Sequence, residues 1–424
     1  MKLVSYWQDT APAFGGAEAG PVEGKADVVV VGAGFTGLSA ALALARRGAS
    51  VVVLEAERVV AKQSGRNGGH VNNGLAHDFG GLAARLGLDR ARALYHAYDA
   101  AVDTVERIVA KEAIACDFRR SGKIKLAAKP GHWDGLARGF ELLHREADPE
   151  TDLIPRDRLR EEVGSDAFHG GLLYRKSAQM HMGRFGKGLA EAAVRHGARI
   201  FEGAAVTGLA RLPGGAHRVT TVRGGIEAKQ VLLATGPSRQ APLFFRRRVI
   251  PVGSFIIATA PLGEAQVASV MPHRRTATTT MNIGNYFRFS PDNRLIFGGR
   301  ARFALSNPGS DAKSGRILQA QLRAAFPQIA EVPVEYCWGG EVDMTADRLP
   351  RAGERDGLFY AMGFSGHGAQ MSVHLGRQMA AVMGGDAAAN PFRGLDWPAV
   401  PGHFGPPWFL PLVGLYYRAK DALQ

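Results

Sequence analysis

A glycine-rich turn near the start of the chain has the residue types and spacing of a phosphate-binding loop. Gly32, Gly34 and Gly37 form a GxGxxG pattern between a run of valines and an alanine- and leucine-rich stretch. In such a turn the first glycine permits a tight bend, the second lets the backbone approach a pyrophosphate, and the third lets a helix pack closely on a strand. The following helix N-terminus would offer N–H groups and partial positive charge to phosphates. The pattern, with Phe35 and Thr36 inside it, predicts a dinucleotide site.

A carboxylate follows this turn at the distance that dinucleotide-binding folds require. The apolar run 28–31 predicts a strand buried on both faces, residues 36–47 a helix, and residues 50–54 a second buried strand. Glu55 and Ala56 follow that strand, about 20 residues after the first glycine. A carboxylate there accepts hydrogen bonds from ribose hydroxyls and would repel a 2′-phosphate, which argues against NADP.

A second glycine-rich segment, Ser64-Gly65-Arg66-Asn67-Gly68-Gly69-His70, lies shortly after the carboxylate. Small residues would let its backbone lie against a flat ring, with N–H groups meeting the polar edge of that ring. Arg66 could reach a pyrophosphate. Taken alone, the segment could equally be a glycine-rich surface loop.

Composition and charge argue against several classes of protein. The chain has 424 residues, 46% apolar and 21% charged, which predicts a globular protein of two domains. Its only cysteines, Cys116 and Cys337, form no CxxC pattern, so we expect no disulfide framework, no metal site and a reducing compartment. The net charge of +13 is dispersed, which predicts no nucleic-acid partner. Residues 1–24 lack a signal peptide and no apolar run is long enough to span a bilayer, so we expect a cytoplasmic protein.

Pieces of a dinucleotide fold recur along the chain, separated by strand-rich segments. Apolar spacing predicts helices over 82–112, 184–196, 316–326 and 368–383. It predicts strands over 122–128, 199–209, 217–222, 230–234, 249–260, 282–290, 294–299 and 358–362. Residues 1–25 read as a loosely structured arm anchored by Tyr6 and Trp7. We therefore expect two domains interleaved along the chain.

These motifs together resemble the D-amino-acid oxidase-like family of FAD-dependent amine and amino-acid oxidoreductases, and within it the γ-glutamylputrescine oxidoreductase branch. The resemblance covers nearly the whole chain. It is carried by residues 5–7, 28–48, 51–59, 64–69, 285–300, 338–353 and 357–380.

The resemblance implies an α/β fold in which a Rossmann-type FAD-binding domain is interleaved with a strand-rich α+β substrate domain, of the glutathione-reductase-like type. It places the FAD-binding domain at residues 1–80, 185–240 and 345–424, including the C-terminal tail. The substrate domain then takes residues 81–184 and 241–344.

The same resemblance implies further FAD-binding residues. Val206 matches the position whose backbone holds the adenine, and Thr235 and Gly236 match a turn beside the cofactor. A C-terminal loop would face the pyrimidine end of the flavin, where backbone amides stabilise negative charge; it contains Gly363, Ser365, Gly366, His367 and Gly368. His367 is a candidate general base, with simple packing in the loop as the alternative.

The resemblance also bears on how the cofactor is held. In sarcosine oxidase relatives a cysteine in the equivalent of the W-x-G segment bonds the flavin covalently. The matching residue is Gly340, and Cys337 stands three positions too early. We therefore expect non-covalent FAD, with Cys337 as a small buried apolar residue.

The class of substrate is inferred from one apolar residue. Relatives that oxidise α-amino acids place an arginine, the natural carboxylate partner, where this chain has Val342, flanked by two acids. This favours an amine without an adjacent carboxylate, although Arg348 or Arg288 could replace the missing arginine or pair structurally. The remaining candidates for the cavity are His70 and Tyr286, which with His367 are the expected catalytic residues, and Phe287 and Trp338, for which packing is the stronger reading.

The implied reaction is oxidation of an amine C–N bond, with oxygen or another acceptor taking the electrons. γ-Glutamylputrescine or a similar small-molecule amine is the expected substrate. Three alternatives stay open: a membrane-surface amino-acid or opine dehydrogenase or electron-transfer subunit, a tRNA-modifying flavin enzyme, and a flavoprotein that only binds or scaffolds. The first rests on the apolar, proline-containing tail 406–418, for which packing on the FAD-binding domain is the favoured reading.

Overall fold

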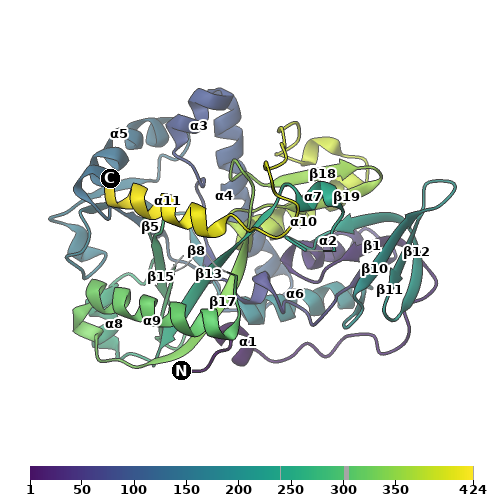
Figure 1. Cartoon of the computed structure of the whole chain (residues 1–424), viewed down its shortest axis with the longest axis horizontal. Helices are drawn as coiled ribbons and strands as arrows, with labels where there is room; N and C mark the ends of the chain where they lie inside the picture. The colour runs from purple at the N-terminus through teal and green to yellow at the C-terminus, as the bar shows by residue number, and fades with distance from the viewer. Residues whose placement is uncertain (239, 300–304, 424) are drawn as a thin grey trace.

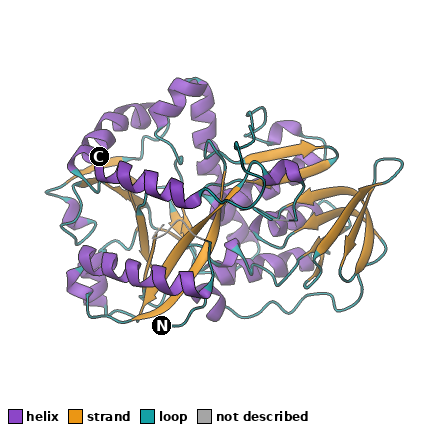
Figure 2. Ribbon diagram, in the orientation of Figure 1, coloured by secondary structure: helices purple, strands orange, loops and turns teal. Residues whose placement is uncertain are grey.

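Two eight-stranded sheets organise the computed structural model, which describes residues 1–238, 240–299 and 305–423 (Figures 1 and 2). The first sheet has the order β10-β11-β12-β1-β2-β9, with β19 paired to the second half of β12 and β18 paired to β19. Its strands are β1 (Lys25–Val31), β2 (Val51–Leu54), β9 (Arg199–Phe201), β10 (Val206–Arg211), β11 (His217–Thr221), β12 (Gly224–Leu233), β18 (Arg351–Arg355) and β19 (Leu358–Met362).

The centre of this sheet is parallel, as the buried valine runs predicted. β1 pairs in parallel with both β2 and β12, and β12 pairs in parallel with β19. The long helices α2 and α10 pack against each other, and α6 and α4 pack on them in turn. Their bounds are α2 (Phe35–Ala45), α4 (Leu88–Lys111), α6 (Met182–Arg195) and α10 (Gly368–Met383).

The second sheet, with the order β17-β13-β16-β15-β14-β5-β7-β6, occupies the other half of the molecule. Its strands are β5 (Lys123–Leu126), β6 (Asp152–Pro155), β7 (Gly170–Tyr174), β13 (Ile250–Thr259), β14 (Thr276–Thr279), β15 (Asn285–Phe289), β16 (Leu295–Gly299) and β17 (Val334–Met344). One face of it is apolar and packs under α8 (Glu264–Val270) and α9 (Pro308–Ala325). Arg300, the last residue of the motif 285–300, lies outside the described residues.

Smaller elements join the two halves. A three-stranded sheet is formed by β3 (His70–Val71), β8 (Ala178–Gln179) and β4 (Arg119–Arg120). The remaining helices are α1 (Tyr6–Asp9), α3 (Phe79–Leu86), α5 (Pro130–Glu146), α7 (Leu243–Arg246) and α11 (Leu410–Leu423), with 3-10 turns at Gln63–Gly65, Leu159–Glu161, Pro327–Ile329 and Ala387–Ala389. The single helix predicted over 82–112 is two helices, because Gly87 takes a positive φ of 86° between them.

The two sheets are interleaved along the chain as expected. Every strand of the first sheet falls in the ranges assigned to the FAD-binding domain, and every strand of the second in those assigned to the substrate domain. The helices follow these ranges less closely, since α4 packs against α10. The domain limits themselves therefore remain a proposal.

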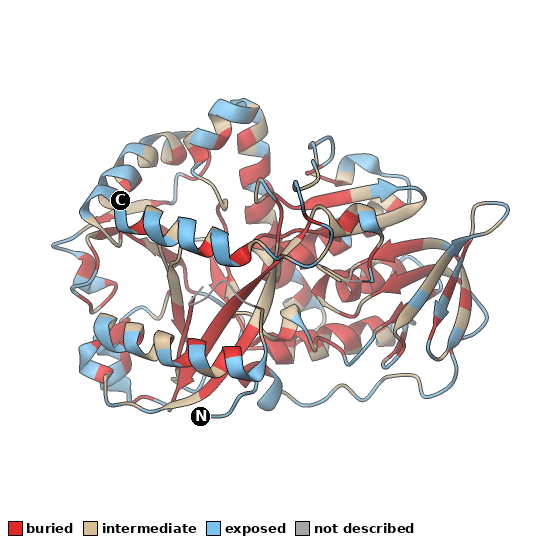
Figure 3. Cartoon of the chain, viewed as in Figure 1, coloured by how far each residue is buried: buried red, intermediate tan, exposed pale blue. Residues whose placement is uncertain are grey.

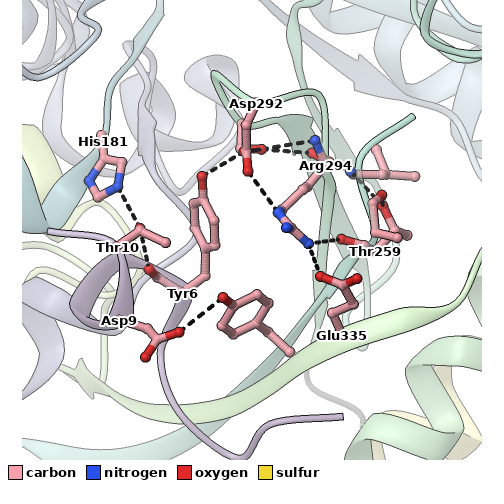
Figure 4. A network of polar contacts seen from close by, with 12 residues as sticks. Tyr6, Asp9, Thr10, His181, Thr259, Asp292, Arg294 and Glu335 are labelled. Carbon is pink, nitrogen blue, oxygen red and sulfur yellow. Dashed lines mark hydrogen bonds and ion pairs between the residues drawn. The ribbon is translucent and has the colours of Figure 1, made fainter. Parts of the chain in front are cut away.

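The N-terminal arm is more structured than the sequence suggested. α1 buries both of its aromatic side chains, with Trp7 fully enclosed. The Tyr6 hydroxyl donates to Asp292 (2.6 Å), which also accepts from the Arg294 guanidinium, and Arg294 reaches on to the Thr259 carbonyl (Figure 4). The arm is thereby tied to the turn between β15 and β16.

The C-terminal helix crosses toward the second sheet. The Asp421 carboxylate accepts from the backbone N–H groups of Asn282 and Ile283, and the Asp421 carbonyl accepts from Lys129. Within the tail 406–418, Leu410 packs with Val252 and Met344 of the second sheet, so the expectation that this tail packs on the FAD-binding domain is wrong at that residue. Much of the outer surface of α11 is exposed (Figure 3). Across the described residues, no helix combines the length and apolar character needed to cross a membrane.

Candidate active site

A cavity of about 1120 Å³ lies between the two sheets. It exceeds the range of roughly 300–1,000 Å³ typical of small-ligand sites, so it has room for a large cofactor together with a substrate. Its walls come from the carboxyl ends of β1, β2 and β12, from the 64–70 segment, from the inner face of the second sheet and from the loop before α10.

The glycine-rich turn opens on this cavity in the predicted geometry. Gly32 takes a positive φ of 106°, and a Cβ there would lie 2.7 Å from the Ala234 carbonyl oxygen. Gly34, Phe35 and Thr36 line the cavity at the N-terminus of α2. Gly37 does not line it; instead a Cβ there would lie 1.9 Å from the Gly32 oxygen, so this glycine sets how closely helix and strand pack.

Glu55 ends β2 beside the turn and lines the cavity together with Ala56. Its carboxylate accepts from the backbone N–H groups of Ala33 (2.8 Å) and Glu57 (2.9 Å). Burial raises the pKa of Glu55 above its ordinary value, and these two bonds oppose that shift. The carboxylate is thus held at the place where a ribose would be bound.

Two further predicted contacts with the cofactor lie at the same end. Val206 lines the cavity from β10, and Thr235 and Gly236 line it just after β12. The Thr235 hydroxyl oxygen is buried without a hydrogen-bond partner. A buried, unpaired hydroxyl is costly in a protein interior, so this atom is matched to a polar ligand.

The 64–70 segment is held by hydrogen bonds from side chains that the sequence analysis did not assign to it. The Trp7 indole N–H donates to the Asn67 carbonyl (2.6 Å), and the Trp338 indole N–H donates to the Arg66 carbonyl (3.1 Å). The Ser64 hydroxyl accepts from the Phe35 N–H (3.0 Å), which ties the segment to the glycine-rich turn. Ser64, Arg66, Asn67 and Gly68 line the cavity, whereas Gly69, with a φ of 82°, does not.

Two side chains predicted to meet cofactor or substrate are directed elsewhere. The Arg66 side chain lines the cavity, but its Nε donates to the Gly339 carbonyl (2.6 Å) and its guanidinium lies 3.7 Å from the Asp311 carboxylate. Trp338 is fully buried and does not line the cavity, which agrees with the packing interpretation and rejects it as a substrate residue. Its indole is used to position the 64–70 segment.

His70 and Tyr286 meet at the wall of the cavity. Their rings lie 5.4 Å apart, edge to face. His70 Nδ1 lies 3.1 Å from the Gly68 carbonyl, which assigns the proton to Nδ1, and Nε2 is buried without a partner. Burial, reinforced by the charge of Arg288, lowers the pKa of His70 to about 3, so the imidazole is neutral. The Tyr286 hydroxyl lies 2.9 Å from the Ser254 hydroxyl, a cavity residue that the sequence did not reveal.

The loop before α10 closes another side of the cavity. Ser365, Gly366, His367 and Gly368 line it, while Gly363 turns away and donates its N–H to the Asp343 carboxylate (2.6 Å). His367 stacks edge to face on Tyr98, and burial lowers the pKa of His367 to about 3. Its Nδ1 is buried without a partner. A histidine that is neutral in this way is a weak base, so packing is the better supported role.

The arginines proposed as carboxylate partners lie in different places. Arg288 is buried, and its guanidinium donates to the carbonyls of Gly69 (2.5 Å), Met180 (2.9 Å) and Phe289 (3.1 Å). It does not line the cavity, so its assignment to substrate is corrected: it is a structural cation. Arg348 does line the cavity, and its guanidinium lies 3.4 Å from the Tyr417 hydroxyl of α11.

Phe287 and Val342 complete the predicted set. Phe287 is fully buried in the core on the far face of the second sheet, as the packing interpretation held. Val342 lines the cavity between Glu341 and Asp343. Burial raises the pKa of Asp343 to about 6, opposed by backbone hydrogen bonds from the 363–364 segment. The Asp343 carboxylate therefore accepts hydrogen bonds from that loop, and the residue also lines the cavity.

Two lysines in the cavity wall were missed. Lys123 and Lys125 line the cavity from β5, opposite the buried Ile124 and Leu126. The sequence Lys-Ile-Lys-Leu carried a signal for them, because alternate residues of a strand share a face and here one face is cationic.

Comparison with known proteins assigns the family. The model of the DAO family, described as FAD dependent oxidoreductase, matches residues 27–382. The chain belongs to this family. It is 33% identical to the probable oxidoreductase OrdL of Haemophilus influenzae over 89% of this chain and 87% of that protein. It is 31% identical to γ-glutamylputrescine oxidoreductase of Escherichia coli over 94% of this chain and 93% of that protein.

Solved structures agree at the level of the fold. Glycine oxidase from Geobacillus kaustophilus superposes with a TM-score of 0.70 and 21% identity, covering 88% of this chain and all of that one. The expected fold class, the FAD cofactor and the assignment as an FAD-dependent oxidoreductase are thereby confirmed.

The residues present fit FAD. The glycine-rich turn, Glu55 and Val206 form one end of the cavity, where phosphates and a ribose can be held by backbone N–H groups and a carboxylate. Thr235 and His367 each present a buried polar atom without a partner. Neither cysteine of the chain lines the cavity, which agrees with the expectation that the flavin is not bonded to a thiol.

Proposed function

We propose that this DAO-family protein oxidises the C–N bond of an amine that carries no carboxylate on the reacting carbon, with γ-glutamylputrescine or a similar amine as substrate. The observation that carries the proposal is Val342, an apolar cavity residue at the position of the family's carboxylate-binding arginine. Arg288 cannot replace that arginine, because its guanidinium donates to three backbone carbonyls. The similarity to γ-glutamylputrescine oxidoreductase supports the same substrate class.

The described residues can orient an amine beside the flavin. FAD, when bound, accepts the hydride that leaves the carbon next to the nitrogen. In this proposal the Nε2 of neutral His70, which is buried without a partner, accepts a hydrogen bond from the amine N–H. The Tyr286 and Ser254 hydroxyls, 2.9 Å apart, provide a second polar contact. The low dielectric of this wall disfavours an ammonium and so favours the free amine, the form that can be oxidised. The resulting imine is hydrolysed to an aldehyde.

The test is anaerobic bleaching of the oxidised-flavin absorption by a panel of amines. The panel contains γ-glutamylputrescine, putrescine, sarcosine, glycine, D-alanine and an opine. Rapid bleaching by γ-glutamylputrescine and slow or no bleaching by the α-amino acids is the expected result. Bleaching by D-alanine or the opine instead would reject the reading of Val342 and make Arg348 the carboxylate partner. No bleaching by any compound would reject the amine assignment.

A second candidate concerns the electron acceptor. The outer face of α11 and the segment before it expose Phe404, Trp408, Leu412, Leu415 and Tyr416, of which Trp408 is 67% exposed. An apolar face of this kind favours a dehydrogenase that works at a membrane surface. That candidate predicts dye reduction without peroxide formation and recovery of the protein with the membrane fraction. Stoichiometric hydrogen peroxide would identify an oxidase.

A further inference from the structure

A row of polar side chains crosses the second sheet on the face that lines the cavity. Lys125 of β5 pairs with Thr278 of β14, and Thr278 pairs with Tyr286 of β15. All three line the cavity. The neighbouring row is Ile124, Ala277 and Phe287, which is buried in the core on the opposite face. The alternation of a strand therefore fixes Lys125 and Tyr286 on the same wall.

Lys125 differs from the lysine two positions before it. Lys123 is 6% exposed, donates to the Asn73 carbonyl (2.7 Å) and lies 3.9 Å from the centre of the Tyr174 ring. Among the described residues, no hydrogen bond or ion pair includes Lys125. The negative charge of Asp78 opposes the lowering of the Lys125 pKa by burial. The Asp78 carboxylate, however, caps α3 by accepting from the Gly81 N–H (2.8 Å).

Lys125 is partly buried, and a partly buried ammonium without a counter-ion is unfavourable. Desolvation destabilises the charged form of such a cation unless it is paired. Burial accordingly lowers the pKa of Lys125, and an anion bound beside it would oppose that shift. Since Lys125 faces a cavity large enough for a substrate as well as the cofactor, the missing partner can be a group that arrives with the substrate.

The distance between strands indicates how far the anionic group must lie from the reacting amine. Neighbouring strands lie about 4.8 Å apart, so Lys125 and Tyr286, separated by two strand spacings, are about 10 Å apart across the sheet. His70 and Tyr286 mark the end of the cavity at which the amine is proposed to react. An extended γ-glutamylputrescine molecule, with its reacting amine at one end and a carboxylate at the other, is long enough to span this distance.

We propose that Lys125 forms a carboxylate subsite at the end of the cavity remote from His70, so that the enzyme selects amines bearing a distant carboxylate. This rests on the proposed amine oxidation for the identity of the substrate, but the subsite can be tested without turnover. In this arrangement Val342 and Lys125 have complementary effects. The first removes affinity for a carboxylate on the reacting carbon, and the second supplies affinity for a carboxylate at the far end.

The test uses a ligand that cannot react at its amine end. γ-Glutamylbutylamide, which lacks the terminal amine, and the same compound with its carboxylate converted to a carboxamide are titrated into the holoenzyme. Binding is followed by perturbation of the visible flavin spectrum and by calorimetry. We expect the carboxylate form to bind at least about tenfold more tightly, because a hydrogen bond to a charged group contributes more than a neutral one.

Variants locate the preference. Lys125→Met should remove it, leaving both ligands equally weak, and Lys125→Arg should restore most of it. Lys313→Met, which removes the same charge from an exposed position on α9, is the matched control and should preserve it. Equal affinity for the two ligands in the unmodified enzyme would overturn the proposal. A preference that survives in Lys125→Met and disappears in Arg348→Met would also overturn it.

The two proposals fail separately. If γ-glutamylputrescine does not bleach the flavin but the carboxylate preference depends on Lys125, the subsite stands and the proposed substrate is wrong. If γ-glutamylputrescine bleaches the flavin at the same rate and half-saturating concentration in Lys125→Met as in the unmodified enzyme, the amine oxidation stands and the subsite is rejected.

Discussion

Replacing Trp7 with phenylalanine should weaken FAD binding even though Trp7 does not line the cavity. The side chain is fully buried, and its indole N–H donates to the Asn67 carbonyl at 2.6 Å. Asn67 in turn accepts from the Gly69 N–H through its side chain (2.9 Å), so the Trp7 contact holds the segment that faces the cofactor. Phenylalanine keeps an aromatic ring in this place and removes the donor.

The magnitude follows from that one donor. Loss of a hydrogen bond costs about 1–3 kcal/mol when it leaves a carbonyl unsatisfied in the interior, and the Asn67 carbonyl is partly buried. In the unmodified protein the segment is held before the cofactor arrives, whereas in Trp7→Phe the binding of FAD must order it. FAD affinity should therefore fall by roughly 5- to 30-fold, which corresponds to about 1–2 kcal/mol of that cost.

The assay is titration of apoprotein with FAD, followed by quenching of flavin fluorescence, alongside thermal unfolding of the apoprotein. Tyr6→Phe is the matched control, since it removes a partly buried hydrogen bond on the same helix, to Asp292 rather than to the 64–70 segment. We expect it to lower stability and leave FAD affinity unchanged. If the two variants lose the same stability and neither changes FAD affinity, the positioning role of Trp7 is refuted.

Three further changes test other parts of the site. Gly37→Ala places a Cβ 1.9 Å from the Gly32 oxygen and should yield protein with little bound flavin, whereas Gly131→Ala, with no atom near its Cβ, should retain full occupancy by absorbance. Arg288→Met removes the donor to three carbonyls and should lower the free energy of unfolding by about 2–4 kcal/mol in a denaturant titration. A change confined to substrate affinity would contradict this. Burial raises the pKa of Asp343 from 3.8 to about 6. Between these two pH values the folded apoprotein binds more protons at Asp343 than the unfolded chain does, so the stability of the apoprotein should fall as pH rises through this window. Asp343→Asn should remove this pH dependence of stability, and its apoprotein should have a higher melting temperature than the unmodified apoprotein above about pH 7. Parallel curves of melting temperature against pH for the two proteins would contradict this.

The cofactor half of the site was accessible from the sequence because its determinants are local. The run 28–31, the glycine-rich turn and Glu55 lie within one strand–helix–strand unit, and the observed β1, α2 and β2 match it closely. Gly32 takes the tight turn and Gly37 sets the packing of helix on strand, as their positions predicted. Backbone geometry of this kind is specified by neighbours in the chain.

The substrate half depends on contacts that no local pattern encodes. Arg288 stands between two buried phenylalanines in a strand, and its partners Gly69 and Met180 come from distant parts of the chain. The strand 122–128 was predicted, but the side on which Lys125 lies relative to the cavity depends on its pairing with β14, a strand that the sequence did not reveal. The destination of α11 likewise depends on Asp421 meeting Asn282.

The order of strands in the first sheet has a consequence for how the protein is made. The central strand β1 is synthesised before its neighbour β12, and β19, which completes the edge of β12, is synthesised after both. The cavity is lined by residues of the glycine-rich turn and of the loop before α10, so we expect a growing chain to capture FAD only after that loop has left the ribosome. Before β19 pairs with it, half of β12 is an unpaired strand edge. Such an edge can bind chaperones or pair with other chains and aggregate. The yield of active enzyme in a cell should therefore respond to the supply of flavin at the moment of release rather than during elongation.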